Sequence, residues 1–184
     1  MIGNLAKSTD TVISSVHSGG KLDNGAYGGG VFSIECRDKD GNLKWKDESH
    51  NLVVNVGLFK GSSYTAAWYL GLIQGPGSGT TIAAGDTLAS HAGWTESTAY
   101  SGNRKAVTFG TATTADPSVI SNSASPAVFS INATATIAGA FLASVDSGTS
   151  GILFSAADFQ SPGDRSVVDG DTLNITYQFS LDAS

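Results

Sequence analysis

The sequence has little of what many binding and catalytic sites require. Only ten of its 184 residues are Lys or Arg, against 16 Asp or Glu, and the formal net charge is −6. Cys36 is the only cysteine, so an internal disulfide is excluded, and the three histidines lie too far apart for a recognised metal spacing. Because a phosphate backbone is neutralised by Lys and Arg, a nucleic-acid partner is not expected.

Long apolar runs are also missing. The longest, residues 66–73, is too short to span a bilayer, and residues 1–16 show no basic start followed by an apolar block. We therefore expect no membrane partner and no secretory signal. In their place the chain has 25 Ser, 17 Thr and 23 Gly, which predicts a surface of hydroxyl, amide and small side chains.

Two stretches, residues 127–137 and 172–181, alternate apolar and polar residues with a period of two. Successive side chains of an extended chain point to opposite faces, so each stretch predicts a half-buried strand. Hydrophobic residues make up 40% of the chain, enough for one core. The predicted fold class is all-β: an antiparallel β-sandwich or jelly-roll-like barrel of about eight or nine strands over residues 31–184, after an extended N-terminal arm, residues 1–30.

The remaining chain is divided by turn and loop residues. Further strands are expected at residues 31–36, 43–46, 50–55, 66–73, 104–113, 139–145 and 151–159, a short helix at 55–63, and loops at 74–79 and 115–126. Asp40-Gly41 predicts a hairpin, and residues 168–171 a turn. Because residues 66–73 are apolar on both faces, they should lie centrally in a sheet. Residues 80–102 hold few regular signals, and we expect them to form a long, packed, irregular excursion.

Motifs that resemble metal or catalytic sites have a simpler explanation. Asp38-x-Asp40-x-Asn42 begins like a calcium loop, but Gly41 stands at the fourth position instead of the sixth, which favours a hairpin turn. Cys36 shares one face of its strand with apolar residues and is predicted to be a buried structural thiol. We expect no catalytic residue, no metal and no cofactor. The enzyme alternative, glycan cleavage, would need a cleft lined by carboxylates among Asp158, Asp164, Asp169 and Asp171.

Aromatic residues offer a second candidate site. Trp68, Trp94 and Tyr100, with Asn and Ser around them, would form a stacking platform for sugar rings if they were exposed. Packing in the core is the favoured use of the same rings, since aromatic side chains are a main source of buried area.

Five segments carry a resemblance to a known group of proteins. They are residues 50–58 (HNLVVNVGL), 68–72 (WYLGL), 84–96 (AGDTLASHAGWTE), 123–131 (SASPAVFSI) and 163–173 (GDRSVVDGDTL). The chain resembles a set of small virion structural proteins of tailed bacteriophages over residues 31–181. The resemblance implies a component of the virus particle and no catalytic role.

We therefore expect a capsid decoration, or cement, protein that binds the outer surface of the head and stabilises contacts between major capsid subunits. It would be assembled in the host cytoplasm, with the major capsid protein and further copies of itself, as a trimer or dimer, as partners. The apolar residues of the arm would contact the capsid: Leu5, Val12, Ile13 and Val16. The alternative is a tail or head fibre module that binds a host glycan through Trp68, Trp94 or Tyr100.

Overall fold

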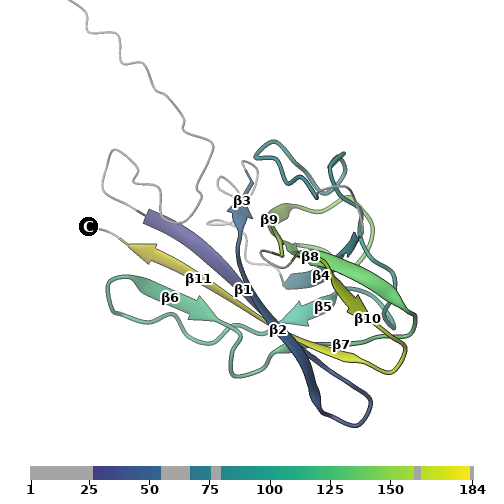
Figure 1. Ribbon diagram of the computed structural model, residues 1–184. Coiled ribbons are helices and arrows are strands. Elements are labelled where there is room, and N and C mark those ends of the chain that lie inside the picture. The colour runs from purple at the N-terminus through teal and green to yellow at the C-terminus, as the bar shows by residue number, and fades with distance from the viewer. Residues whose placement is uncertain (1–26, 55–66, 76–79, 160–162, 183–184) are drawn as a thin grey trace, which may run out of the picture.

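The computed structural model describes residues 27–54, 67–75, 80–159 and 163–182 (Figure 1). These residues contain no helix, and the predicted all-β class is confirmed. The strands are β1 (Tyr27–Arg37), β2 (Leu43–His50), β3 (Leu52–Val53), β4 (Trp68–Gly75), β5 (Lys105–Val107), β6 (Ser118–Ser121), β7 (Ala127–Ser130), β8 (Ala135–Ala143), β9 (Leu153–Asp158), β10 (Arg165–Val167) and β11 (Thr172–Asp182).

The strands form two antiparallel sheets. Sheet A has the order β2-β1-β11-β6. β7 also pairs with β11, at residues 172–175, whereas β6 pairs with residues 178–181 of the same strand. Sheet B has the order β3-β9-β8-β4-β5, and β10 pairs with β8. The longest pairing joins β1 and β11 from Tyr27↔Asp182 to Arg37↔Thr172, so the two strands lie side by side in Figure 1.

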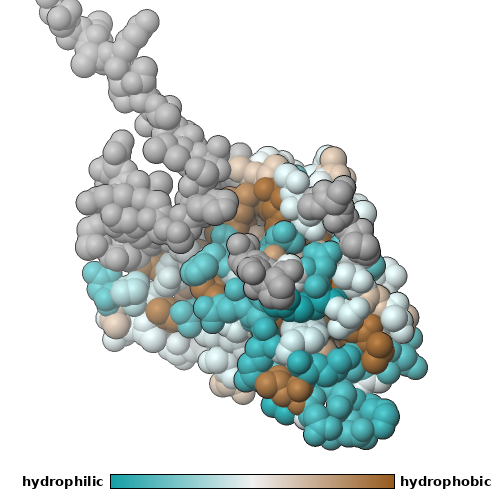
Figure 2. Space-filling model, in the orientation of Figure 1, coloured by the Kyte–Doolittle hydropathy of each residue, from teal (hydrophilic) through white to brown (hydrophobic). Residues whose placement is uncertain are grey.

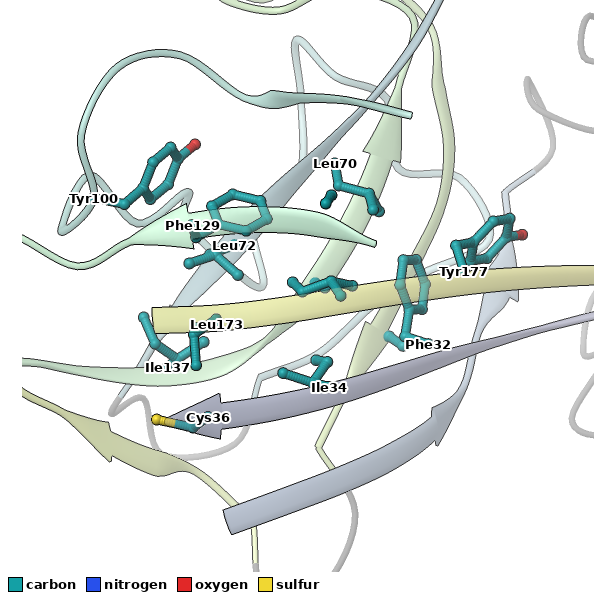
Figure 3. Packing of buried hydrophobic residues seen from close by; sticks show 14 of the residues in the cluster. Phe32, Ile34, Cys36, Leu70, Leu72, Tyr100, Phe129, Ile137, Leu173 and Tyr177 are labelled. Atoms are coloured by element: carbon teal, nitrogen blue, oxygen red, sulfur yellow. The ribbon is translucent and has the colours of Figure 1, made fainter. Parts of the chain in front are cut away.

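The main core lies between the two sheets (Figure 3). Phe32 and Ile34 of β1 point towards Leu70 and Leu72 of β4, and all four are at most 2% exposed. In β11, Leu173, Ile175 and Tyr177 are buried, as the period of two predicts, whereas Leu181 near the end of the strand is 53% exposed. Each such side chain removed from water contributes about 1.5–3 kcal/mol before the entropy of folding is subtracted.

A second apolar cluster covers the other face of sheet B. Ile73 of β4 and Phe141 of β8 pack there against Leu88 and Trp94, which belong to the excursion 80–102. The prediction of a packed excursion is therefore confirmed. So is the central place of β4, which lies between β8 and β5. Sheet B is buried on both faces, whereas sheet A leaves one face to solvent.

The prediction of one continuous strand over residues 127–137 is wrong, because these residues belong to two strands. β7 ends at Ser130 in sheet A, and β8 begins at Ala135 in sheet B. Between them the backbone N–H of Ile131 donates to the carbonyl of Asp171, and that of Asn132 to the carbonyl of Ala99. The alternation of apolar residues persists across a corner at which the chain passes from one sheet to the other.

Other predicted boundaries also change. Within residues 104–113 only β5 is a strand, and β6 lies in the predicted loop 115–126. β2 continues without a break to His50, and β4 extends into the predicted loop 74–79. The sequence did not predict β10. The described residues thus contain eleven strands, where eight or nine were expected. The predicted helix 55–63 lies outside the described residues.

Residues 27–30, predicted to belong to the arm, form the start of β1. Glycine is required there at Gly30, where a Cβ atom would lie 2.5 Å from the Tyr177 hydroxyl and 2.7 Å from the Asn51 amide. The Asn51 side chain links Gly30 to Tyr177. Its Oδ1 accepts from the Gly30 N–H at 2.8 Å, and its Nδ2 donates to Tyr177 Oη at 2.9 Å. Gly30 therefore allows close packing of β1 against Tyr177 and Asn51.

Candidate functional site

The solvent-facing side of sheet A carries an ordered set of polar side chains. The register aligns Glu48 of β2, Ser33 of β1 and Thr176 of β11 in one row across the strands. A second row, two residues along each strand, consists of Lys46, Glu35 and Asn174. Neighbours within a row are about 4.8 Å apart at the backbone, and the rows are about 7 Å apart. We call these six residues the polar grid.

The polar grid lines a shallow, open hollow of about 590 Å³. Pro126, from the loop before β7, forms part of its wall, and Ile34 and Asp47 complete the lining. On the face of the molecule that Figure 2 shows, brown patches are separated by hydrophilic and neutral residues. Seven of the nine residues that line the hollow have polar side chains.

The charges in the hollow are largely compensated. Glu35 receives hydrogen bonds from Lys46, at 2.6 Å, and from Arg37. The Lys46 bond is the main cause that lowers the pKa of Glu35, and partial burial opposes it. Asp47 pairs with Arg165, and both side chains are mostly buried. Glu48 differs, because within the described chain its carboxylate accepts only from the Ser33 hydroxyl, at 3.5 Å.

Two members of the polar grid keep their hydrogen-bonding groups available. Asn174 and Thr176 are half-buried, and their side chains form no hydrogen bond within the part of the chain that the structure describes. Together with Ser33 and Glu48, they place an amide, two hydroxyls and a carboxylate on a rigid three-stranded frame. Such a surface can bind a polar ligand, and its geometry is set by the strand register.

The aromatic candidates are not assembled into a platform. Trp94 is 5% exposed and packs on Phe141 in the cluster outside sheet B, while Tyr100 is 6% exposed and packs edge-on against Phe129 in the main core. Trp68 is half-buried, edge-on to Phe154. Core packing is thus the observed use of Trp94 and Tyr100, and their rings offer no open face to a sugar.

The predicted turns are confirmed. Asp38 Oδ1 accepts from the backbone N–H groups of Asp40 and Asn42, both at 2.9 Å, and Gly41 has φ 84°, a left-handed conformation that favours glycine. In the turn 168–171, Gly170 has φ 88°. The two hydrogen bonds to Asp38 Oδ1 stabilise the hairpin turn that the sequence predicts at 38–42.

The four carboxylates named for glycan cleavage lie outside the hollow. Asp171 is buried and accepts from Lys44 and from the Val168 N–H, so it holds the turn in place. Asp169 is exposed. Asp158 has a raised pKa, mainly through burial and also through the charge of Asp164.

Three further findings concern the remaining candidates. Cys36 is fully buried, as predicted, and burial raises its pKa to about 12. The described residues contain no group of three or more His, Cys, Asp or Glu side chains suited to hold a metal ion, and no helix among them could cross a bilayer. The capsid-binding candidates Leu5, Val12, Ile13 and Val16 lie outside the described residues.

The polar grid was not among the residues predicted from the sequence. Its signal was the polar half of the alternation in β1 and β11, which marks one face as solvent-exposed but does not say which residues become neighbours. Comparison of the chain with protein-family models, curated proteins and solved structures found no match.

Proposed function

We propose that this chain is a bacteriophage capsid decoration protein, a passive binding module and not an enzyme. The observation that carries the proposal is the unequal burial of the two sheets. Sheet B is covered on both faces, while sheet A presents a hydroxyl- and amide-rich face to solvent. A frame of this kind needs no partner to complete its core, and it suits lasting exposure on the outside of a particle.

Attachment to the shell is assigned to the segment before β1. Residues 1–26 include Leu5, Val12, Ile13 and Val16, and they join the body at Tyr27, the first residue of a strand bonded on both sides. Binding to the assembled shell alone would stabilise that state by mass action, by an amount that grows with concentration relative to Kd. The partners in this proposal are the major capsid protein and further copies of the chain, as a trimer or dimer.

The resemblance of residues 31–181 to small virion proteins of tailed phages supports a place in the particle. The alternative is a tail or head fibre module that binds a host glycan. It keeps a physical basis in the hollow of sheet A, although Trp94 and Tyr100 are buried.

The deciding measurement is the copy number of the chain in purified particles, by quantitative mass spectrometry against the major capsid protein. Decoration predicts a number that tracks the capsid subunits, on the head surface in an electron cryomicroscopy reconstruction. A few copies, or density confined to the tail, would contradict it and favour the fibre module.

The role of the arm is tested by deletion of residues 1–26, which leaves β1 complete. The shortened protein should unfold at the same denaturant concentration as the full chain but no longer sediment with particles stripped of the protein. A variant with Leu5, Val12, Ile13 and Val16 all replaced by Ser should behave in the same way. Undiminished sedimentation of either variant would refute the arm as the tether.

A further inference from the structure

We propose that the hollow over the polar grid binds a neutral saccharide. This inference goes beyond capsid decoration and does not depend on it, since it concerns the solvent-facing side of sheet A and not the segment before β1. The hollow, about 590 Å³, lies within the range of small-molecule sites, which is roughly 300–1,000 Å³.

The side chains of Asn174 and Thr176, which form no hydrogen bond among the described residues, match the hydroxyls of a sugar. A sugar hydroxyl both donates and accepts, and the Asn174 amide and the Thr176 hydroxyl do the same. Glu48 adds an acceptor that, in the part of the chain that the structure describes, has one long hydrogen bond, from Ser33. Because the register fixes neighbours within a row about 4.8 Å apart and the two rows about 7 Å apart, these groups are arranged before a ligand arrives.

The charges decide against an anionic ligand. The lining contains the carboxylates of Glu35, Asp47 and Glu48 and one cation, Lys46. Lys46 is already engaged by Glu35, and Asp47 by Arg165. The carboxylate of Glu48 is thus uncompensated and would repel a sialylated or sulfated glycan. A neutral saccharide avoids this cost.

The surface is less suited to a protein partner. Stable protein interfaces bury about 800 Å² on each side and centre on aromatic, Arg or large apolar anchors in fitted pockets. In the hollow the apolar lining is Pro126 and Ile34, and Ile34 is only 2% exposed. A ligand held by hydrogen bonds to individual side chains fits better. Without a stacking ring, we expect weak binding, with Kd on the order of 1 mM to 0.1 mM.

The test begins with the full chain, made in bacteria, on an array of neutral, sialylated and sulfated oligosaccharides. The neutral trisaccharide with the strongest signal is then titrated by calorimetry and by two-dimensional NMR. Binding should shift the backbone signals of Ser33, Glu35, Glu48, Asn174 and Thr176. This mapping uses the unmodified protein, so it stays informative if a variant fails to fold.

Substitutions supply the second measurement. Thr176→Val removes the hydroxyl with little change of shape and should weaken binding by roughly five- to tenfold, the worth of one hydrogen bond. Thr172→Val is the matched control, because Thr172 lies on the same face of the same strand and outside the hollow lining. It should leave the affinity unchanged.

Several results would overturn the saccharide site. They are the absence of neutral-sugar binding at millimolar concentration, a preference for sialylated or sulfated glycans, NMR shifts away from the polar grid, and equal effects of the two Thr substitutions. If the unmodified protein binds no sugar and the Thr176→Val variant no longer sediments with particles, the hollow would be assigned to a protein partner. Failure of the arm deletion to prevent sedimentation affects only the proposed decoration role.

Discussion

The contact between Gly71 and Phe141 makes the substitution Gly71→Ala a sharp test of the packing on the outer side of sheet B. The two residues are directly opposite each other in β4 and β8. A Cβ atom on residue 71 would lie 2.3 Å from Cζ and 2.4 Å from Cε1 of Phe141. Unstrained carbon atoms approach to about 3.5–4.0 Å, so the ring would have to move.

Movement of the ring is restricted. Phe141 is fully buried. The centroid of its ring lies 5.1 Å from the centroid of the Trp94 ring and 5.2 Å from the guanidinium carbon of Arg104. Arg104 is itself fixed by Glu96 through two hydrogen bonds of 2.8 and 2.7 Å. Overpacking of this kind costs about 1–3 kcal/mol, and replacement of glycine by alanine in a strand returns about 0.5–1 kcal/mol. We expect a net loss of about 1–2 kcal/mol.

The assay is guanidinium unfolding followed by tryptophan fluorescence, with the loss seen as a lower midpoint at unchanged slope. In a thermal scan the same loss corresponds to a decrease in Tm of about 2–8 °C. Gly29→Ala is the control, since a Cβ there meets nothing within 4 Å, and it should be neutral or slightly stabilising. Combined with Phe141→Leu, Gly71→Ala should cost at least 1 kcal/mol less than alone, roughly the coupling expected of residues in contact. A neutral Gly71→Ala, or strict additivity with Phe141→Leu, would refute the reasoning.

Three further outcomes are expected. Tyr177→Phe should lower the free energy of unfolding by about 1–2 kcal/mol, because the buried Asn51 Nδ2 loses its acceptor; an unchanged midpoint would count against this network. Cys36 should react with thiol reagents only as fast as the chain unfolds, since it is buried and its pKa is raised to about 12, and rapid labelling of the native protein would contradict this. Burial and Asp164 raise the pKa of Asp158, so the folded chain binds that proton more tightly than the unfolded chain, and stability falls as pH rises from the ordinary carboxyl pKa through the raised one. Asp158→Asn should flatten that part of the stability–pH curve, and a steeper curve would show the sign to be wrong.

The strands that could be predicted from the sequence are those whose pattern is local. In β11 the apolar and polar halves separate onto two faces, so Leu173, Ile175 and Tyr177 are buried as their spacing requires. Between Ser130 and Ala135 the same pattern is misleading, because a period of two gives the face of each residue but not the sheet to which it belongs. The ends of β5 and β6 depend on partners distant in the chain, which no local pattern contains.

The candidate site shows the same limit. Ser33, Glu35, Asn174 and Thr176 stand at polar positions of alternating stretches, so their exposure could be inferred. Their arrangement in rows with β2 depends on the register of three strands, two of which are more than a hundred residues apart in the sequence. The aromatic candidates failed for a related reason: Trp94 is buried because the excursion folds back onto sheet B.

The position of Tyr27 has a mechanical consequence for a tethered protein. β1 is bonded to β11 along its whole length and to β2 from Val31 to Arg37. A force applied at Tyr27 along the strand axis shears these two ladders, so many backbone hydrogen bonds share the load and none is peeled away alone. A domain anchored through this strand would therefore withstand a larger pulling force before it unfolds than a domain anchored through an edge strand.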